Sequence, residues 1–323
     1  MNFNNDKRKI VLVGAGSVGM SFAFALLNSR VCNELVIIDI DKKRAEGEAM
    51  DLNHGLAFSQ GSMNISAGDY PDCYDADIVV ICAGVPQRPG EDRISLLRRN
   101  KAVFEEIIDK VVESGFNGIF LVASNPVDIM TYITRERSGF PKERVIGTGT
   151  TLDTARLRYL LGTYLGVDPR NIHAYVMGEH GDSEFVPWSQ AYMSTKSILS
   201  ICAECDNCYK ACELCEIEAD VRGAAQKIIE AKKATYYGIA VALLRIVKAI
   251  FGDEKSVFTV SAYLDGEYGQ KGIYAGVPCI VSRNGIERIV ELDLTEEELS
   301  KLDKSCKFLS SVIEDMSTAA ISK

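Results

Sequence analysis

The sequence has no hydrophobic run as long as the roughly 20 apolar residues that cross a membrane. Its most apolar helical stretch, Ile239–Phe251, is interrupted by Arg245 and Lys248, and Met1–Ile10 contains no apolar signal region. Positive charge is also in short supply, since 36 Lys and Arg face 45 Asp and Glu, for a net charge of −9. We therefore expect a soluble, cytoplasmic protein whose main partner is neither a nucleic acid nor a membrane.

Cysteine is too scarce for a disulfide scaffold, with ten in 323 residues. Five of the ten nevertheless lie close together, at Cys202, Cys205, Cys208, Cys212 and Cys215. The first four have the spacing of a bacterial iron–sulfur run, although Glu213 stands where proline usually follows. The last three also fit one face of a helix. Inert thiols, a metal site and redox-sensitive disulfides are the three hypotheses for this cluster.

The length of 323 residues predicts two packed domains, because a single core rarely grows so large. We place them at 1–147 and 148–323. In the first, helical stretches at 20–28, 42–58 and 94–114 alternate with strand-like runs at 9–13, 35–39, 78–82 and 119–123, which indicates a parallel sheet. In the second, helices at 151–165, at 216–251 and from 295 mix with strands at 171–177, 257–264 and 276–282, which favours an α+β domain.

A glycine pattern follows the first strand-like run. The absence of a side chain permits a tight turn at Gly14, the approach of a pyrophosphate at Gly16 and close helix packing at Gly19. Asp39 ends the next strand 20 residues after Gly19, where it can accept hydrogen bonds from a ribose. This acid would repel a 2′-phosphate, so the pattern predicts NAD rather than NADP in a doubly wound, Rossmann-type domain.

A histidine flanked by glycines, His180 in Gly178–Asp182, is the candidate acid–base group. Asp153 and Arg156 lie three residues apart on a predicted helix and so share one face. They could form an ordinary ion pair within the helix. Alternatively, Asp153 orients the histidine while Arg156 binds a carboxylate with its planar guanidinium group.

The loop at 83–93 contains two glycines, two prolines and, near its end, Arg93. A loop of this composition that follows an apolar strand and carries an arginine is a plausible active-site lid.

Five motifs together resemble the lactate/malate dehydrogenase family: Gly-Ala-Gly-Ser-Val-Gly, Ala-Gly-Val-Pro-Gln-Arg-Pro-Gly-Glu-Asp-Arg, Ser-Asn-Pro-Val-Asp, Leu-Asp-Thr-Ala-Arg and Gly-Glu-His-Gly-Asp-Ser. They occur in the order and spacing of the family, and the resemblance covers nearly the whole chain. It implies an α/β protein, with a doubly wound Rossmann domain followed by an α+β catalytic domain. It also implies a homotetramer.

The resemblance assigns NAD binding to Gly14, Gly16, Val18, Gly19, Asp39 and Asn125, the last also lying near the substrate. It implies that His180 and Asp153 are the acid–base pair and that Arg93 polarises the substrate carbonyl. Arg156 would bind the substrate carboxylate, with Thr235 beside it. No metal is expected.

Gln87 decides between the two expected substrates. Malate dehydrogenases carry arginine at this position of the lid, where it pairs with the second carboxylate of oxaloacetate. Such a pair about 4 Å apart contributes roughly 4 kcal/mol at an effective dielectric of 20, or about three decades in rate. A neutral glutamine therefore favours pyruvate and L-lactate, interconverted with NADH and NAD⁺ at the fermentative end of glycolysis. A malate or broader 2-hydroxy acid dehydrogenase, and an NAD-binding protein with a metal or redox cysteine cluster, are the alternatives.

Two further positions match an effector site. Arg158 and His173 correspond to residues that bind fructose 1,6-bisphosphate between subunits in the allosteric bacterial members of the family. Facing cations across a two-fold axis would repel until a bisphosphate bridged them. The alternative is that both are ordinary surface residues.

Overall fold

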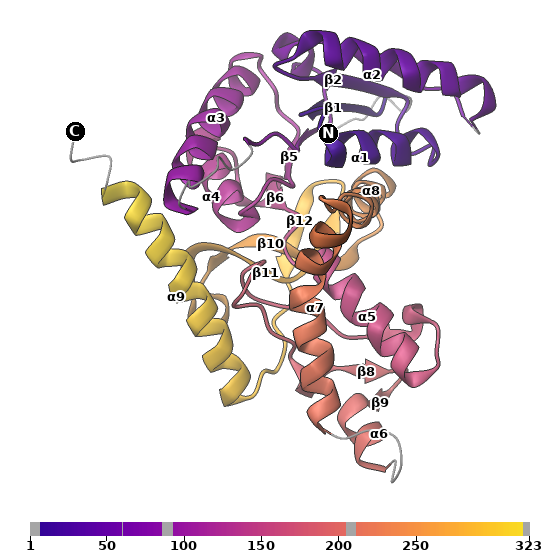
Figure 1. Ribbon diagram of the computed structural model, residues 1–323. Coiled ribbons are helices and arrows are strands. Elements are labelled where there is room, and N and C mark those ends of the chain that lie inside the picture. Colours follow the sequence, from indigo (N-terminus) through magenta and orange to yellow (C-terminus); the bar gives the residue numbers. More distant parts are fainter. Residues whose placement is uncertain (1–6, 60, 86–92, 205–210, 319–323) are drawn as a thin grey trace. The chain divides into compact units, whose positions relative to one another are not determined.

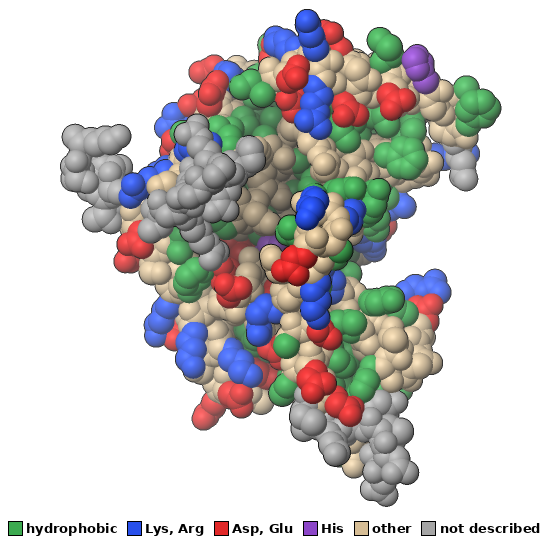
Figure 2. Space-filling model, viewed as in Figure 1, with side chains coloured by type: hydrophobic (Ala, Val, Ile, Leu, Met, Phe, Trp, Pro, Cys, Tyr) green, Lys and Arg blue, Asp and Glu red, His purple; other side chains and the backbone are tan. Residues whose placement is uncertain are grey.

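The computed structural model describes residues 7–59, 61–85, 93–204 and 211–318 (Figure 1). They form two compact units, one of Met1–Thr148, Tyr236–Ser256 and Val281–Glu287, the other of Gly149–Thr235, Val257–Ile280 and Arg288–Lys323. The predicted domain boundary lies at residue 147. Two segments beyond it, Tyr236–Ser256 and Val281–Glu287, cluster with the first unit. None of the helices in the described ranges is both long and apolar enough to span a membrane. Acidic and basic side chains are interspersed over the coloured residues of the face in Figure 2.

The first unit contains six neighbouring parallel strands of a nine-stranded sheet, in the order β3-β2-β1-β4-β5-β6. Its central strands are short β-branched runs that are buried along their whole length, as expected for a sheet covered on both faces. The expected strands are all present, while β3 and β6, of four and three residues, were not predicted. The strands are β1 (Lys9–Val13), β2 (Glu34–Ile38), β3 (Asn64–Ala67), β4 (Ile78–Ile81), β5 (Ile119–Val122) and β6 (Val145–Gly147).

Helices complete the first unit, and the prediction of a doubly wound α/β domain is confirmed. Helix α1 packs against α8, which comes from the late segment, and α3 packs against α4. Helix α1 starts three residues before the expected position because Gly16 is its N-cap. Helix α4 was not predicted. The helices are α1 (Ser17–Leu27), α2 (Lys42–Gly55), α3 (Arg93–Glu113), α4 (Val127–Ser138) and α8 (Tyr237–Gly252).

The second unit contains helices α5, α6, α7 and α9 with short and long strands, so the prediction of a mixed α/β second domain is also confirmed. Its core joins α5, α6 and α7 through apolar side chains such as Leu157, Ile198 and Val221. The elements are α5 (Thr151–Leu165), β7 (Ile172–His173), β8 (Tyr192–Met193), β9 (Lys196–Ser197), α6 (Ile198–Glu204), α7 (Ala211–Lys232), β10 (Ser256–Asp265), β11 (Lys271–Ser282) and α9 (Glu296–Thr318). Strand β12 (Gly285–Ile289) belongs to the first unit up to Glu287.

The long helical region expected over 216–251 is present as two helices, because α7 ends just before Lys233, which adopts a left-handed conformation with φ of 71°. One expectation for this part of the chain was wrong. The strand expected over 171–177 is reduced to Ile172–His173. Beyond it, the main chain of Val176 bonds to threonine side chains of α5 rather than to another strand.

Candidate active site

The glycines that follow β1 are required by their surroundings. Gly14 has φ of +108°, and a Cβ there would lie 2.7 Å from the main-chain nitrogen of Ala83. A Cβ on Gly19 would lie 2.1 Å from the carbonyl oxygen of Gly14, so the helix could not pack so closely. At Gly16, by contrast, a Cβ would meet nothing within 4 Å. The turn is therefore open at Gly16, the N-cap of α1, and helix N-termini of this kind are where proteins commonly bind phosphate groups.

Asp39, directly after β2, is held against the same turn. Its carboxylate accepts hydrogen bonds from the main-chain nitrogens of Ala15 at 2.7 Å and Asp41 at 2.9 Å. Each oxygen keeps a lone pair for another donor, such as a ribose hydroxyl. Val18 is half-buried in the first turn of α1, and Asn125 is exposed just beyond β5. The glycine turn lies where the sheet order reverses between β1 and β4, which is where doubly wound sheets bind ligands.

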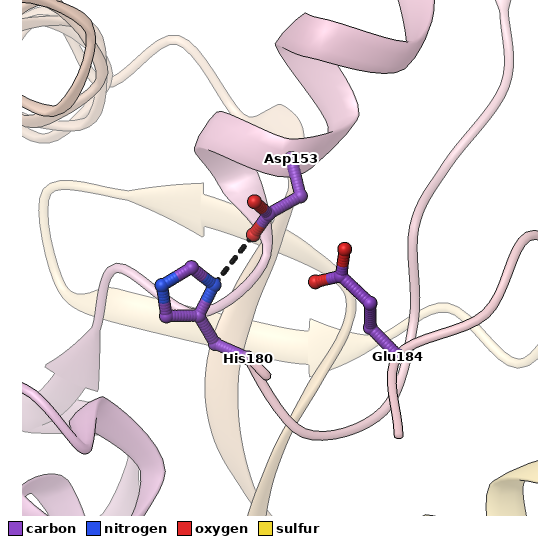
Figure 3. A group of neighbouring side chains, drawn as sticks. All are labelled: Asp153, His180 and Glu184. Atoms are coloured by element: carbon purple, nitrogen blue, oxygen red, sulfur yellow. Dashed lines mark hydrogen bonds and ion pairs between the residues drawn. The ribbon is translucent and has the colours of Figure 1, made fainter. Parts of the chain in front are cut away.

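Asp153, Arg156 and His180 form one hydrogen-bonded group in the second unit. Figure 3 shows the hydrogen bond between Asp153 and His180. One oxygen of Asp153 accepts from Arg156 Nη1 at 2.6 Å, and the other lies 2.6 Å from His180 Nδ1. The Asp153 side chain is only 2% exposed, whereas that of His180 is 23% exposed. With Nδ1 hydrogen-bonded to Asp153, Nε2 is the ring nitrogen that can exchange a proton with a ligand. Asp153 thus combines the two roles considered from the sequence.

Threonine side chains fix the helix that carries Asp153. Thr150 Oγ1 donates to the carbonyl oxygen of Val176 at 2.6 Å, and Thr154 Oγ1 accepts from the nitrogen of Val176 at 2.9 Å. Thr154 also shares a 2.8 Å hydrogen bond with Thr259 of β10. All three threonines are buried, so these bonds form away from water. They fix the start of α5 against the segment that leads to His180.

Ser305, on α9, forms hydrogen bonds with the loop that carries His180. This buried hydroxyl accepts a 2.7 Å hydrogen bond from the nitrogen of Glu179 and lies 3.0 Å from Ser183 Oγ. Gly178, with φ of +95°, passes so close that a Cβ would lie 2.7 Å from Ser305 Oγ. Sequence reasoning missed Ser305, since it lies 126 residues from Glu179. The flanking glycine is needed for the path of the loop.

A third ionisable group, Glu184, lies beside the pair and was also missed. It is 4% exposed, and burial, with Asp153 nearby, raises its pKa to about 8. Burial alone would also raise the pKa of Asp153, but His180 and Arg156 hold that pKa below its ordinary value. Asp153 therefore stays ionised at neutral pH.

The donor atoms of Asp153, His180 and Glu184 lie within 4.8 Å of one another, and among the described residues this is the group that could hold a metal ion. Both oxygens of Asp153 are already hydrogen-bonded, as is His180 Nδ1. These hydrogen bonds already account for the positions of the Asp153 and His180 side chains.

The remaining expected substrate residues are less fully described. Gln87 lies outside the described residues. Arg93 is the first residue of α3, and its side chain lies outside them too. Thr235 is half-buried in the turn between α7 and α8. The second unit therefore brings together Asp153, Arg156 and His180, while Arg93 and Asn125 belong to the first unit.

The two expected effector residues lie on neighbouring elements of the second unit. Arg158 of α5 donates a 3.1 Å hydrogen bond to the carbonyl oxygen of Ala174, and its guanidinium group lies over the ring of Tyr175. His173, one residue before Ala174, is exposed. Burial lowers the pKa of Arg158 from its ordinary value. The guanidinium group of Arg158 thus already has two partners within its own chain.

The cysteine cluster is only partly described. Cys202 is buried in α6 as part of the core of the second unit, and Cys215 is exposed on α7. Cys205 and Cys208 lie outside the described residues, as does the side chain of Cys212. Both Cys202 and Cys215 are thiols rather than halves of a disulfide.

Comparison with known proteins gives a consistent result. Residues 8–147 match the lactate/malate dehydrogenase NAD binding domain, and residues 150–319 match the alpha/beta C-terminal domain of the same family. L-lactate dehydrogenase 2 of Bacillus cereus is 53% identical over 93% of this chain and 96% of its own. L-lactate dehydrogenase 1 of Bacillus anthracis is 51% identical over the same shares.

Solved structures agree with these relatives. A lactate dehydrogenase from a Medee basin deep-sea metagenome library has a TM-score of 0.94 and 50% identity, covering 97% of this chain and 99% of its own. The minor L-lactate dehydrogenase of Enterococcus mundtii, in its ligands-bound form, has a TM-score of 0.93 and 46% identity, covering 96% and 98%.

Proposed function

The chain belongs to the lactate/malate dehydrogenase family, and we propose that it is an NAD-dependent L-lactate dehydrogenase that interconverts pyruvate and L-lactate. The observation that carries the proposal is the buried Asp153 carboxylate, which is hydrogen-bonded at 2.6 Å both to His180 and to Arg156. Asp153 thereby holds a proton donor, His180, beside a carboxylate-binding group, Arg156. Reduction of a 2-oxo acid requires both groups.

His180 is the general acid. Its Nδ1 proton is held by Asp153, and the Nε2 proton passes to the carbonyl oxygen of pyruvate as the C=O π bond breaks. NADH, when bound, supplies the hydride that forms the new C–H bond at C2. The ionised Asp153 stabilises the protonated ring before this transfer and fixes its orientation. In lactate oxidation the same nitrogen takes the hydroxyl proton.

The other roles follow from the family positions. Arg156 binds the substrate carboxylate with its planar group, and its side chain is 13% exposed, which limits competition from water. Arg93 polarises the carbonyl, and Asn125 and Thr235 contact the substrate. NAD is held by Gly14, Gly16, Val18, Gly19, Asp39 and Asn125.

Gln87 gives the preference for pyruvate. A neutral amide leaves the second carboxylate of oxaloacetate without a partner, whereas the methyl group of pyruvate needs none. Malate dehydrogenase activity is therefore the second candidate, and it would require another cation, such as Arg88, to replace the missing charge.

The proposal is tested by following NADH oxidation with pyruvate and identifying the enantiomer of the lactate formed. We expect L-lactate, with NADH used far better than NADPH because Asp39 repels a 2′-phosphate. Formation of D-lactate, or no pyruvate-dependent oxidation of NADH, would refute it.

We also propose that the protein is a cytoplasmic homotetramer that acts at the end of glycolysis and responds to fructose 1,6-bisphosphate at Arg158 and His173. The cationic Arg158 and the exposed His173 on neighbouring elements support such a site. Pyruvate saturation curves with and without millimolar bisphosphate test it, since activation should lower KM. Sedimentation of the full chain tests the tetramer.

A further inference from the structure

Glu184 brings a second acidic side chain next to Asp153. One carboxylate oxygen of each residue and a ring nitrogen of His180 all lie within 4.8 Å of one another. In Figure 3 the carboxyl group of Glu184 points toward that of Asp153, and the hydrogen bond drawn joins Asp153 to His180. Glu184 is 4% exposed, so water cannot screen two neighbouring negative charges effectively.

Cations near Glu184 are engaged elsewhere. Arg156, on the same helix as Asp153, binds Asp153 through Nη1. Arg222, from α7, donates at 3.0 Å to the main-chain oxygen of Glu184 and at 3.2 Å to Glu218. His180 bonds to Asp153. The charged groups that face Glu184 are thus Asp153, Arg156, His180 and Arg222.

The charges of this group can be counted. Asp153 and Arg156 cancel, and a protonated His180 leaves one positive charge, which the carboxylate of a 2-oxo acid would neutralise. An ionised Glu184 would add a buried negative charge that nothing in this count balances. It would also favour the cationic form of His180 and make the ring a weaker proton donor.

We propose that Glu184 is a positioning residue that keeps its carboxyl group protonated and uncharged at neutral pH, so that a single substrate carboxylate balances the summed charge of Asp153, Arg156 and protonated His180. Its proton stays on Glu184 throughout the reaction, and no bond to the substrate is formed. The role of Glu184 toward substrate rests on the proposed function, whereas its protonation state does not.

The electrostatics of the site support this assignment. Burial is the largest cause of the raised pKa of Glu184, which reaches about 8, and the charge of Asp153 acts in the same direction. His180, Arg156 and Arg222 oppose it only in part. Two acids in one site with pKa values shifted in opposite directions are a recurrent feature of active sites.

Infrared spectroscopy of the whole enzyme tests the protonation state directly. The difference between wild type and Glu184→Gln at pH 6 should contain the C=O stretching band of a protonated carboxylic acid, and this band should disappear as the pH rises through about 8. Glu297→Gln is the matched control, because Glu297 is an exposed acid paired with Lys301. A difference spectrum that contains only carboxylate bands at pH 6 and above would overturn the proposal.

Proton uptake tests the link to the substrate. Calorimetric titration of the NADH complex with oxamate, an unreactive amide with the shape and charge of pyruvate, in buffers of different ionisation enthalpy gives the protons bound per site. Above pH 8, where Glu184 of the free site has lost much of its proton, wild type should take up more protons on binding oxamate than Glu184→Gln does, because Glu184 regains its proton in the complex.

Coincident uptake curves for the two proteins would refute the role toward substrate. If oxamate failed to bind at all, the proposed function would fail, and the infrared bands would still report the state of Glu184.

Discussion

Replacing Asp153 by Asn removes the charge that holds His180 and Arg156 in place while keeping the size of the side chain. The Asp153 side chain is 2% exposed and lies 2.6 Å from a nitrogen of each partner. With charge centres about 4 Å apart and an effective dielectric near 20, the lost attraction to protonated His180 is about 4 kcal/mol. This corresponds to roughly a thousandfold lower kcat/KM for pyruvate.

Steady-state NADH oxidation over a range of pH is the assay. As the pH rises, the variant should lose activity at a lower pH than wild type does. The reason is that His180 holds its proton less strongly without the neighbouring Asp153 carboxylate. Asp168→Asn is the matched control, since Asp168 is exposed and pairs with Arg170 on the surface. A loss below tenfold for Asp153→Asn, with an unshifted pH profile, would refute the reasoning.

Three other predictions follow from particular side chains. Gln87→Arg should shift the ratio of kcat/KM values toward oxaloacetate by about three decades, the worth of one close charge pair; equal ratios would contradict the role of Gln87. Ser305→Ala should lower the free energy of unfolding in urea by about 1–3 kcal/mol, because the buried nitrogen of Glu179 loses its acceptor, whereas the exposed Ser311→Ala on the same helix should change it little. The pKa of Glu184 is raised from 4.5 to about 8 in the folded state, so between these pH values the folded protein binds a proton that the unfolded chain does not. The free energy of unfolding of wild type should therefore fall relative to that of Glu184→Gln as the pH rises through this range, by at most about 1.4 kcal/mol per pH unit. A difference in unfolding free energy that stays constant with pH would contradict this.

Local patterns in the sequence were sufficient for much of the fold. The buried strand β1 and helix α5 begin and end at the predicted residues, and each is followed directly by a glycine with positive φ, Gly14 after β1 and Gly166 after α5. The expected face shared by Asp153 and Arg156 is confirmed by their hydrogen bond. Spacing along a helix needs no knowledge of the rest of the chain.

Features that depend on distant residues could not be predicted in this way. Helix α8 joins the first unit by packing against α1, more than 200 residues earlier, and nothing in its own period indicates this. The strand expected over 171–177 is short because threonines of α5 and not a neighbouring strand bond to Val176. Likewise Ser305 and Glu184 are ordinary residues in the sequence and acquire their importance only from what surrounds them.

The most direct test of the central claim is the ratio of kcat/KM values for pyruvate and oxaloacetate, measured with NADH, with 2-oxobutyrate as a neutral-side-chain control. A site in which Arg156 binds the only substrate carboxylate and Gln87 adds no positive charge should prefer pyruvate to oxaloacetate by well over tenfold, and should accept 2-oxobutyrate better than oxaloacetate. Equal or better use of oxaloacetate would contradict the assignment as a lactate dehydrogenase.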